Sequence, residues 1–251
     1  MVADPIEKTP WLATQGLVAG YLPGINILRG VSVQAARGEV RCVLGPNGTG
    51  KSTLLKVLFG FLAVREGEIR LGGETLRVLA PHEMGRLGVA YLPQRPSIFP
   101  HLTVEVNLRL GCWRRRRERQ HVDELMDRAY ERFPVLLERR RQAAGTLSGG
   151  QQRQLEIARS LMLDPVLFLI DEPTAGIEPR VAALIYDLIK SLAAQGKAVL
   201  LVDQNIKRAL EIADYVYVMR TGTVLSEGSR DAFGGDTEAL VASWLYDSRR
   251  A

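Results

Sequence analysis

The sequence of 251 residues lacks any apolar run close to the roughly 20 residues that a membrane-spanning helix requires. Its most apolar stretches, residues 166–170 and 198–202, have only the length of strands. Residues 1–15 carry acids and prolines early and lack the basic-then-apolar order of a signal peptide. We therefore expect a chain that stays in the cytoplasm.

Cysteine is equally scarce, because Cys42 and Cys112 are the only two, which excludes a disulfide framework and fits a reducing compartment. The formal net charge is +5, with arginine runs at residues 114–117 and 139–141. Such runs can meet nucleic acid or anionic lipid, but they more often form a solvated helix face. No aromatic residues interleave the runs to stack bases, so we expect no nucleic-acid partner.

The chain does contain short apolar strands that alternate with amphipathic helical patterns, which predicts an α/β domain with a largely parallel sheet. Strand patterns with glycine-rich turns at residues 16–20, 31–35 and 68–71 predict a small antiparallel β layer on that sheet. Residues 40–44 predict a buried strand that enters a glycine-rich loop, followed by a helix at about residues 50–60.

The middle of the chain has few strand patterns and many helical ones; in residues 122–132, for example, apolar side chains recur at helical spacing. We expect a helical subdomain at about residues 95–162, inserted into a core formed by about residues 1–94 and 163–251. The elements expected after it are a strand at 166–170, a helix at 179–194, a strand at 198–202 and a hairpin at 215–227.

Residues 45–53 have the sequence Gly-Pro-Asn-Gly-Thr-Gly-Lys-Ser-Thr and fit the pattern G-x-x-x-x-G-K-[ST] between a strand and a helix. Glycines let the backbone curl so that N–H groups point at phosphate oxygens, and the helix presents its positive dipole end to the same anion. By chance, about one per cent of chains this long would match the four fixed positions of the pattern. The residues expected to bind the nucleotide are Asn47, Gly48, Thr49, Gly50, Lys51, Ser52 and Thr53.

Within this loop, Lys51 is expected to reach the β- and γ-phosphates of ATP and the Ser52 hydroxyl to ligate Mg²⁺. A second acidic site follows residues 166–170, where an apolar strand ends in Asp171 and Glu172. An acid at the carboxyl end of a parallel strand lies beside a phosphate loop. We expect Asp171 to hold Mg²⁺ and Glu172 to orient the attacking water. The alternative, two acids that cap a strand end, is weaker beside a phosphate loop.

Residues 146–154, Thr-Leu-Ser-Gly-Gly-Gln-Gln-Arg-Gln, resemble the signature motif of ABC ATPases and offer donors at a helix start, another anion site. In that family the motif faces the γ-phosphate bound on the other subunit. The resemblance spans about residues 17–228 and implies a P-loop NTPase core with the β layer and helical subdomain already expected. It adds nucleotide contacts at Ser148, Gly149, Gly150 and Gln151.

The resemblance carries over to other positions one at a time. Tyr21 occupies the place of the aromatic residue that stacks on adenine, although an ordinary tyrosine of the β layer is the alternative. Gln94 matches the glutamine of the Q-loop, which contacts Mg²⁺ or the lytic water and reports to the membrane subunits. Residues 175–178, Ala-Gly-Ile-Glu, occupy the D-loop and depart from its usual sequence of serine, alanine, leucine and aspartate.

Gln204 is the clearest departure, because the family usually has a histidine there that bridges the γ-phosphate and the catalytic carboxylate. A glutamine can still donate and accept hydrogen bonds but cannot carry positive charge. We expect hydrolysis to survive. Gln204, together with residues 130–134 and 138–140, resembles the ATPase subunits of branched-chain amino acid importers and of relatives that import urea, short amides and other small polar solutes.

The resemblance implies that two ATPase subunits, identical or different, meet head to tail around two ATP molecules. They would act on two transmembrane permeases, through a groove near Gln94 and residues 97–102, with solute delivered by an extracytoplasmic binding protein. The chain would then lie on the inner face of the membrane. A non-transport ABC ATPase, such as a subunit of a cofactor-assembly factor, is the alternative; intact Glu172 argues against a purely regulatory module.

Overall fold

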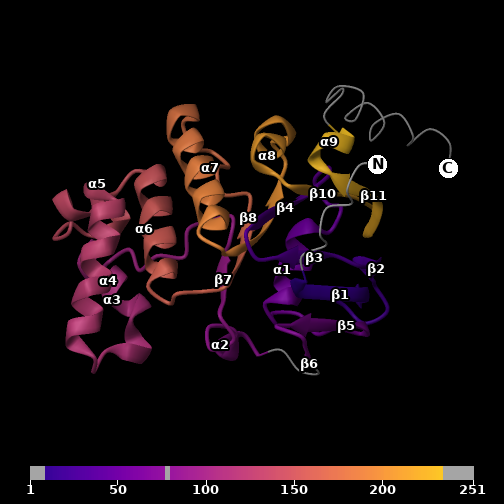
Figure 1. Ribbon diagram of the computed structural model, residues 1–251, viewed down its shortest axis with the longest axis horizontal. Coiled ribbons are helices and arrows are strands. Elements are labelled where there is room, and N and C mark those ends of the chain that lie inside the picture. The colour runs from indigo at the N-terminus through magenta and orange to yellow at the C-terminus, as the bar shows by residue number, and fades with distance from the viewer. Residues whose placement is uncertain (1–8, 77–79, 234–251) are drawn as a thin grey trace.

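The computed structural model describes residues 9–76 and 80–233, and its strands form two separate sheets (Figure 1). The larger sheet has six strands in the order β11-β10-β4-β9-β8-β7. All neighbours in it are parallel except the β10–β11 hairpin. Its strands are β4 (Glu39–Leu44), β7 (Val89–Leu92), β8 (Leu167–Asp171), β9 (Ala198–Asp203), β10 (Tyr215–Arg220) and β11 (Thr223–Ser229).

The central strands β8 and β9 are buried at every residue, as expected for parallel strands covered on both faces. This confirms the strands predicted from the two most apolar stretches of the sequence. The predicted hairpin is also present, with a two-residue turn at Thr221 and Gly222. Strand β7 was not predicted, because four residues are too few to show a pattern.

The smaller sheet is the predicted antiparallel layer, with β1 paired to β2, β3 and β5, and β6 at its edge. One detail was wrong: residues 31–35 do not form one strand, since β2 ends at Val31 and β3 begins at Gln34. The Thr14 hydroxyl accepts a hydrogen bond from Val33 N (2.8 Å) and donates to Val33 O (3.1 Å), which satisfies the interrupted backbone. The strands are β1 (Pro10–Ala19), β2 (Leu28–Val31), β3 (Gln34–Ala36), β5 (Glu66–Leu71) and β6 (Glu74–Leu76).

Helix α1 (Lys51–Leu58) packs between the two sheets, where Leu54, Leu55, Val57 and Leu58 are buried in one hydrophobic cluster with residues of both. A second cluster covers the other face of the large sheet with α6 (Gly149–Leu161), α7 (Pro179–Ala194) and α8 (Ile206–Ile212). Cys42 lies in this second cluster, as the sequence predicted for a core residue. The predicted bounds of the helix at 179–194 are those of α7.

Helices α3 to α6 gather at the end of the molecule away from the small sheet (Figure 1). The buried Asn107 side chain ties α3 to the preceding turn, since its amide nitrogen donates to Phe99 O (2.9 Å) and its oxygen accepts from Phe99 N (2.8 Å). Both arginine runs are exposed. The elements here are α3 (Val104–Gly111), η1 (Trp113–Arg115), α4 (Arg119–Arg132), α5 (Pro134–Glu138) and η2 (Ala144–Thr146).

Two short helices complete the elements of the described chain, α2 (Pro81–Met84) and α9 (Arg230–Phe233). None of the helices in residues 9–76 and 80–233 is long and apolar enough to cross a membrane. The division of the chain into a core and a helical subdomain with boundaries near residues 94 and 163 stays a prediction.

Candidate nucleotide site

The expected site lies where β4, β8 and β9 end side by side. Leu44 pairs with Asp203, and Asp171 pairs with Val202, so these strands finish at one edge of the sheet. The loop at residues 45–50 leaves β4 at this edge and leads into α1. The sheet therefore brings together the phosphate loop and the acids that the sequence places 120 residues further on.

The phosphate loop has a shape that only glycine permits. A Cβ on Gly45 (φ 152°) would lie 2.3 Å from the Met219 carbonyl oxygen. Gly48 (φ 81°) and Gly50 (φ 102°) lie in the left-handed region. Gly222 N donates to Thr49 O (3.0 Å), which fixes the loop to the β10–β11 turn. Gly50 caps α1 without a side chain, and the first turn has no acid, so the positive helix end is open to an anion.

Lys51 is buried, and its ammonium donates to Gly45 O (2.8 Å) and Pro46 O (2.9 Å) of its own loop. Burial lowers the pKa of Lys51, while the carboxylates of Glu172 and Asp171 act in the opposite direction. A buried ammonium that contacts only two neutral carbonyls is stabilised electrostatically when a multivalent anion binds beside it. The arrangement suits phosphate binding at the mouth of the loop.

The Ser52 hydroxyl donates to Asp171 Oδ1 at 2.9 Å, which joins the phosphate loop to the end of β8. Burial raises the pKa of Asp171, and the hydrogen bond from Ser52 opposes this rise. Hydroxyl and carboxylate oxygens are ligands that Mg²⁺ prefers, and two protein ligands plus phosphate oxygens and waters are its usual set. The pair fits a magnesium ion.

Glu172 has a positive φ of 41°, which is uncommon for a residue with a side chain, and its N–H donates to Val202 O (2.8 Å). Its carboxylate accepts a hydrogen bond from Gln94 Nε2 at 2.7 Å. Two residues that the sequence analysis assigned separately are therefore in direct contact. The backbone of Glu172 turns its carboxylate away from the strand and toward the loop that follows β7.

Gln204 follows β9 at the same edge, with an exposed side chain. The preceding Asp203 is buried and fixes this loop, because its carboxylate accepts from Gln204 N (2.8 Å), Asn205 N (2.9 Å) and Tyr186 Oη (2.8 Å). Burial raises the pKa of Asp203, and these hydrogen bonds oppose the rise. Asp203 and Tyr186 were not predicted as supports of this loop, although the position of Asp203 at the end of an apolar strand is a signal that the sequence contains.

Ser148, Gly149, Gly150 and Gln151 lie at the start of α6. Ser148 caps the helix: its hydroxyl accepts from Gln151 N (3.4 Å), and Gln151 Oε1 accepts from Ser148 N (3.1 Å). A Cβ on Gly149 would meet nothing within 4 Å, whereas one on Gly150 would lie 2.5 Å from Val181 of α7. Gly150 is thus needed for packing, and Gly149 keeps an exposed surface free.

Tyr21 is 53% exposed and lies beside the last turn of α1, where its hydroxyl accepts from Lys56 Nζ at 3.2 Å. Lys56 is five residues beyond Lys51, about 7.5 Å along the helix axis. Tyr21 also lines a hollow of about 610 Å³ with Phe59, Phe61, Tyr91, Pro93 and Ser97. The structure does not bring Tyr21 to the phosphate end of α1, so its stacking on adenine stays a prediction. This aromatic hollow was not predicted from the sequence.

A loop of glycines, a buried lysine, a hydroxyl–carboxylate pair and a second carboxylate at the ends of parallel strands define a nucleoside-triphosphate hydrolase site. The model of the ABC transporter family matches residues 28–175. The chain belongs to this family, and it is an ATPase whose ATP hydrolysis powers transport.

Three relatives that match more than four fifths of the chain are all ATP-binding proteins of transport systems. The chain is 40% identical over 219 residues to the probable branched-chain amino acid transport ATP-binding protein LivF of Archaeoglobus fulgidus, covering 87% of this chain and 92% of the relative. It is 40% identical over 208 residues to the high-affinity branched-chain amino acid transport ATP-binding protein BraG of Pseudomonas aeruginosa (83% and 88%). It is also 37% identical over 226 residues to the lipopolysaccharide export system ATP-binding protein LptB of Acidithiobacillus ferridurans (87% and 90%).

Solved structures agree with this fold. A nucleotide-free ATP-binding cassette from an ABC transporter superposes with a TM-score of 0.81 at 29% identity, covering 92% of this chain and 98% of that one. A cassette in its ADP conformation gives a TM-score of 0.81 at 28% identity (95% and 99%). The predicted P-loop NTPase core of ABC type is confirmed.

Proposed function

We propose that this ATPase powers an importer for branched-chain amino acids or a related small polar solute such as urea or a short amide. The support is the 40% identity to LivF and BraG over more than four fifths of the chain, together with Gln204 at the position where the wider family has histidine. The lipopolysaccharide export relative, at 37% identity, has a similar overall match. The solute class therefore rests on the identity to LivF and BraG and on Gln204, and no other residue of the ATP site bears on it.

Within the site, we propose that Ser52 and Asp171 hold Mg²⁺, which neutralises charge on the phosphates when bound, with Gln94 near it. Lys51 and the N–H groups of residues 47–53 bind the β- and γ-phosphates. Glu172 orients the attacking water and receives its proton, and Gln204 stabilises the γ-phosphate by hydrogen bonding. The observation that supports this proposal most directly is the pair of contacts Ser52–Asp171 (2.9 Å) and Gln94–Glu172 (2.7 Å) beside Lys51.

We further propose a head-to-tail dimer, homo- or heterodimeric, in which Ser148, Gly149, Gly150 and Gln151 of one subunit contact ATP bound to the other. The support is that Ser148 and Gly149 are exposed at a helix start with free space at Gly149. Such a dimer completes each site only when two subunits close.

The hollow lined by Phe59, Phe61 and Tyr91 is our proposed docking place for a permease. It adjoins Pro93 and Ser97 on either side of Gln94, and nearby Phe99 (49% exposed) adds apolar surface. The chain would then be peripheral on the inner face of the membrane, with two permeases and, indirectly, an extracytoplasmic binding protein as partners. The relatives do not favour a cofactor-assembly role.

The test is hydrolysis of Mg-ATP by the purified chain and by Glu172→Gln, with size measured in the presence of ATP. We expect the variant to lose about 10²- to 10⁴-fold in kcat, the range for a general base, and to accumulate an ATP-bound dimer. Glu211→Gln, an exposed acid paired with Arg208, serves as the control. Undiminished hydrolysis by Glu172→Gln would remove Glu172 from the proposed role.

A further inference from the structure

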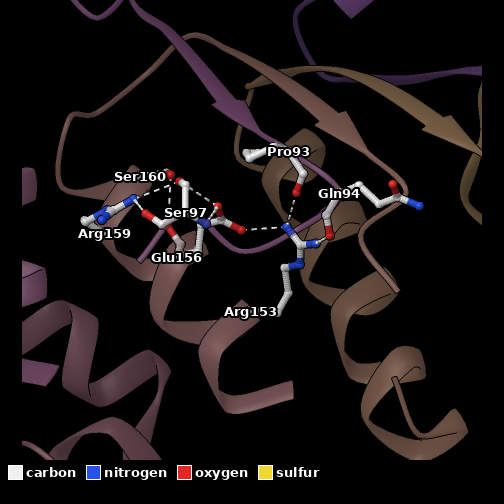
Figure 2. Close-up of polar contacts among 7 residues, drawn as sticks. All are labelled: Pro93, Gln94, Ser97, Arg153, Glu156, Arg159 and Ser160. Atoms are coloured by element: carbon white, nitrogen blue, oxygen red, sulfur yellow. Dashed lines mark hydrogen bonds and ion pairs between the residues drawn. The ribbon is translucent and has the colours of Figure 1, made fainter. Parts of the chain in front are cut away.

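A buried ion pair on α6 is not used by the site described above. Arg153 and Glu156 are each 1% exposed and are joined by a 2.5 Å contact between Nη1 and Oε2 (Figure 2). On the helix that the signature residues begin, Arg153 lies about one turn and Glu156 about two turns after Gly149 and Gly150. Burial lowers the pKa of Arg153 and raises that of Glu156, and each partner opposes the shift of the other.

Both side chains reach across to the segment that follows β7, residues 93–97. Arg153 donates to Pro93 O at 2.8 Å and also to Gln94 O. Glu156 Oε1 accepts from Ser97 N (2.7 Å) and from the Ser97 hydroxyl (2.8 Å). Figure 2 shows the pair between these two groups of backbone contacts. The two ends of the segment are thus held by one pair of side chains.

A buried pair of this kind is poor evidence for stability. The cost of removing two charges from water often equals or exceeds their attraction, and apolar residues of similar volume frequently replace such pairs without loss. The role of the pair here is to orient the backbone of residues 93–97. The planar guanidinium donates to two carbonyls and a carboxylate at once, which fixes the backbone on both sides of Gln94.

The fixed backbone belongs to a residue of the ATP site. The carbonyl of Gln94 is held by Arg153, while its side-chain amide donates to Glu172 at 2.7 Å. A continuous set of contacts therefore runs from α6 through Arg153 and the backbone of Gln94 to the carboxylate of Glu172. A shift of α6, which carries the signature residues at its first turn, would move the backbone from which Gln94 reaches Glu172.

We propose that Arg153 and Glu156 are positioning residues that hold residues 93–97 so that Gln94 engages Glu172 when α6 is in place. This inference rests on the proposed roles of Gln94 and Glu172. Helix α6 would then have two roles: it presents Ser148 and Gly149 to a partner subunit, and it positions residues 93–97 of its own subunit. Arg159, which contacts Ser97 and lies over Phe99 at 5.4 Å, supports the far end of the same segment.

The experiment replaces the whole pair, Arg153→Met with Glu156→Leu, so that neither member of the pair is left buried without the other. We expect thermal stability close to that of the native chain, a loss of about 10- to 100-fold in kcat, and little change in the KM for ATP. Arg41→Met with Glu39→Leu, which replaces the largely buried ion pair of β4 (3.1 Å), is the matched control and should leave kcat unchanged. A stable double variant with native kcat would overturn the proposal.

A cycle with Gln94→Ala separates positioning from a general structural effect. If the pair acts through Gln94, its replacement should cost little further kcat in the Gln94→Ala background, because the contact it supports is already gone. Additive losses would overturn the proposal while leaving the role of Gln94 intact. If Gln94→Ala alone leaves kcat unchanged, the proposed function of Gln94 is wrong, and the positioning proposal falls with it.

Hydrogen exchange provides a readout that needs no activity. The Ser97 amide donates to Glu156 in the native chain, so replacement of the α6 pair should speed its exchange by about tenfold or more, while replacement of the Arg41–Glu39 pair should not. Unchanged protection of Ser97 in the pair variant would show that other contacts fix the segment, which would also overturn the proposal.

Discussion

The two halves of the proposed ATP site differ in how their polar groups are satisfied. At the phosphate loop, the contacts join segments far apart in the chain, since Ser52 and Asp171 are 119 positions apart. At the start of α6, Ser148 and Gln151 cap the helix through each other, three residues apart. The first half is assembled by the whole fold, whereas the second is a local cap that leaves its surface exposed. A preorganised half and an open half are what a site shared between two subunits requires.

The largest effect is expected at the preorganised half, from Lys51→Met. This change removes the buried ammonium that lies between Gly45 O and Pro46 O, and we expect kcat/KM for ATP to fall by at least about 10²- to 10³-fold. Lys56→Met is the control, since Lys56 lies further along α1 against Tyr21. Steady-state hydrolysis and ATP binding measure both. Comparable losses in the two variants would contradict a special role for Lys51.

The open half is tested by Gly149→Asp, which places an anion where nothing lies within 4 Å of a Cβ. We expect each monomer to bind ATP normally but the ATP-trapped dimer to be lost, with hydrolysis reduced about 10²-fold by charge repulsion. Size measurement with ATP present and ATP titration separate the two effects. Loss of ATP binding by the monomer would place Gly149 in the same half as Lys51.

Mixing the two inactive variants sharpens the comparison. A mixed dimer of Lys51→Met and Gly149→Asp contains one site with an intact loop and an intact signature. With random pairing and independently working sites, up to about one quarter of the native rate should return. A mixture that neither hydrolyses ATP nor forms ATP-trapped dimers would argue against a site shared head to tail.

Sequence reasoning found the preorganised half because its loop is contiguous and its acids end a visible apolar strand. The bounds of α7 were predicted because Pro179 and a long apolar periodicity mark them. Arg153 and Glu156 were not recognised, since two charged residues in a helix resemble a solvated face until tertiary structure buries them. The location of Tyr21 beside Lys56 depends on the path of a loop that no periodic pattern specifies.

A smaller effect is expected from Gln204→His at the end of β9. The backbone N–H of residue 204 donates to the buried Asp203, so the loop should keep its shape while the side chain gains the ability to carry charge. We expect kcat to be preserved or raised, within about tenfold of the native value. Steady-state rates from pH 6 to 8 measure this, and the variant should acquire a histidine titration. Loss of hydrolysis would contradict the proposed hydrogen-bonding role of Gln204.

The smallest effect is expected on the stability of the fold, which is lowered at neutral pH because the Asp171 carboxylate is buried without its cation. Burial raises the pKa of Asp171, so the folded chain holds that proton more tightly than the unfolded chain, whose carboxyl titrates near ~3.9. Its contribution to stability is therefore most favourable at low pH, falls as the pH rises from the unfolded pKa through the folded one, and is unfavourable at neutral pH.

Asp171→Asn removes that charge and can still accept the hydrogen bond from Ser52. Without nucleotide at pH 7, we expect its melting temperature to exceed that of the native chain by about 2–4 °C, with a weaker dependence on pH. Mg-ATP should stabilise the native chain but add much less to the variant. Asp187→Asn, an exposed position on α7, should change neither property. A less stable Asp171→Asn chain would mean that the carboxylate serves the fold itself, and the phosphate-loop edge would then be preorganised for stability and not for its ligand.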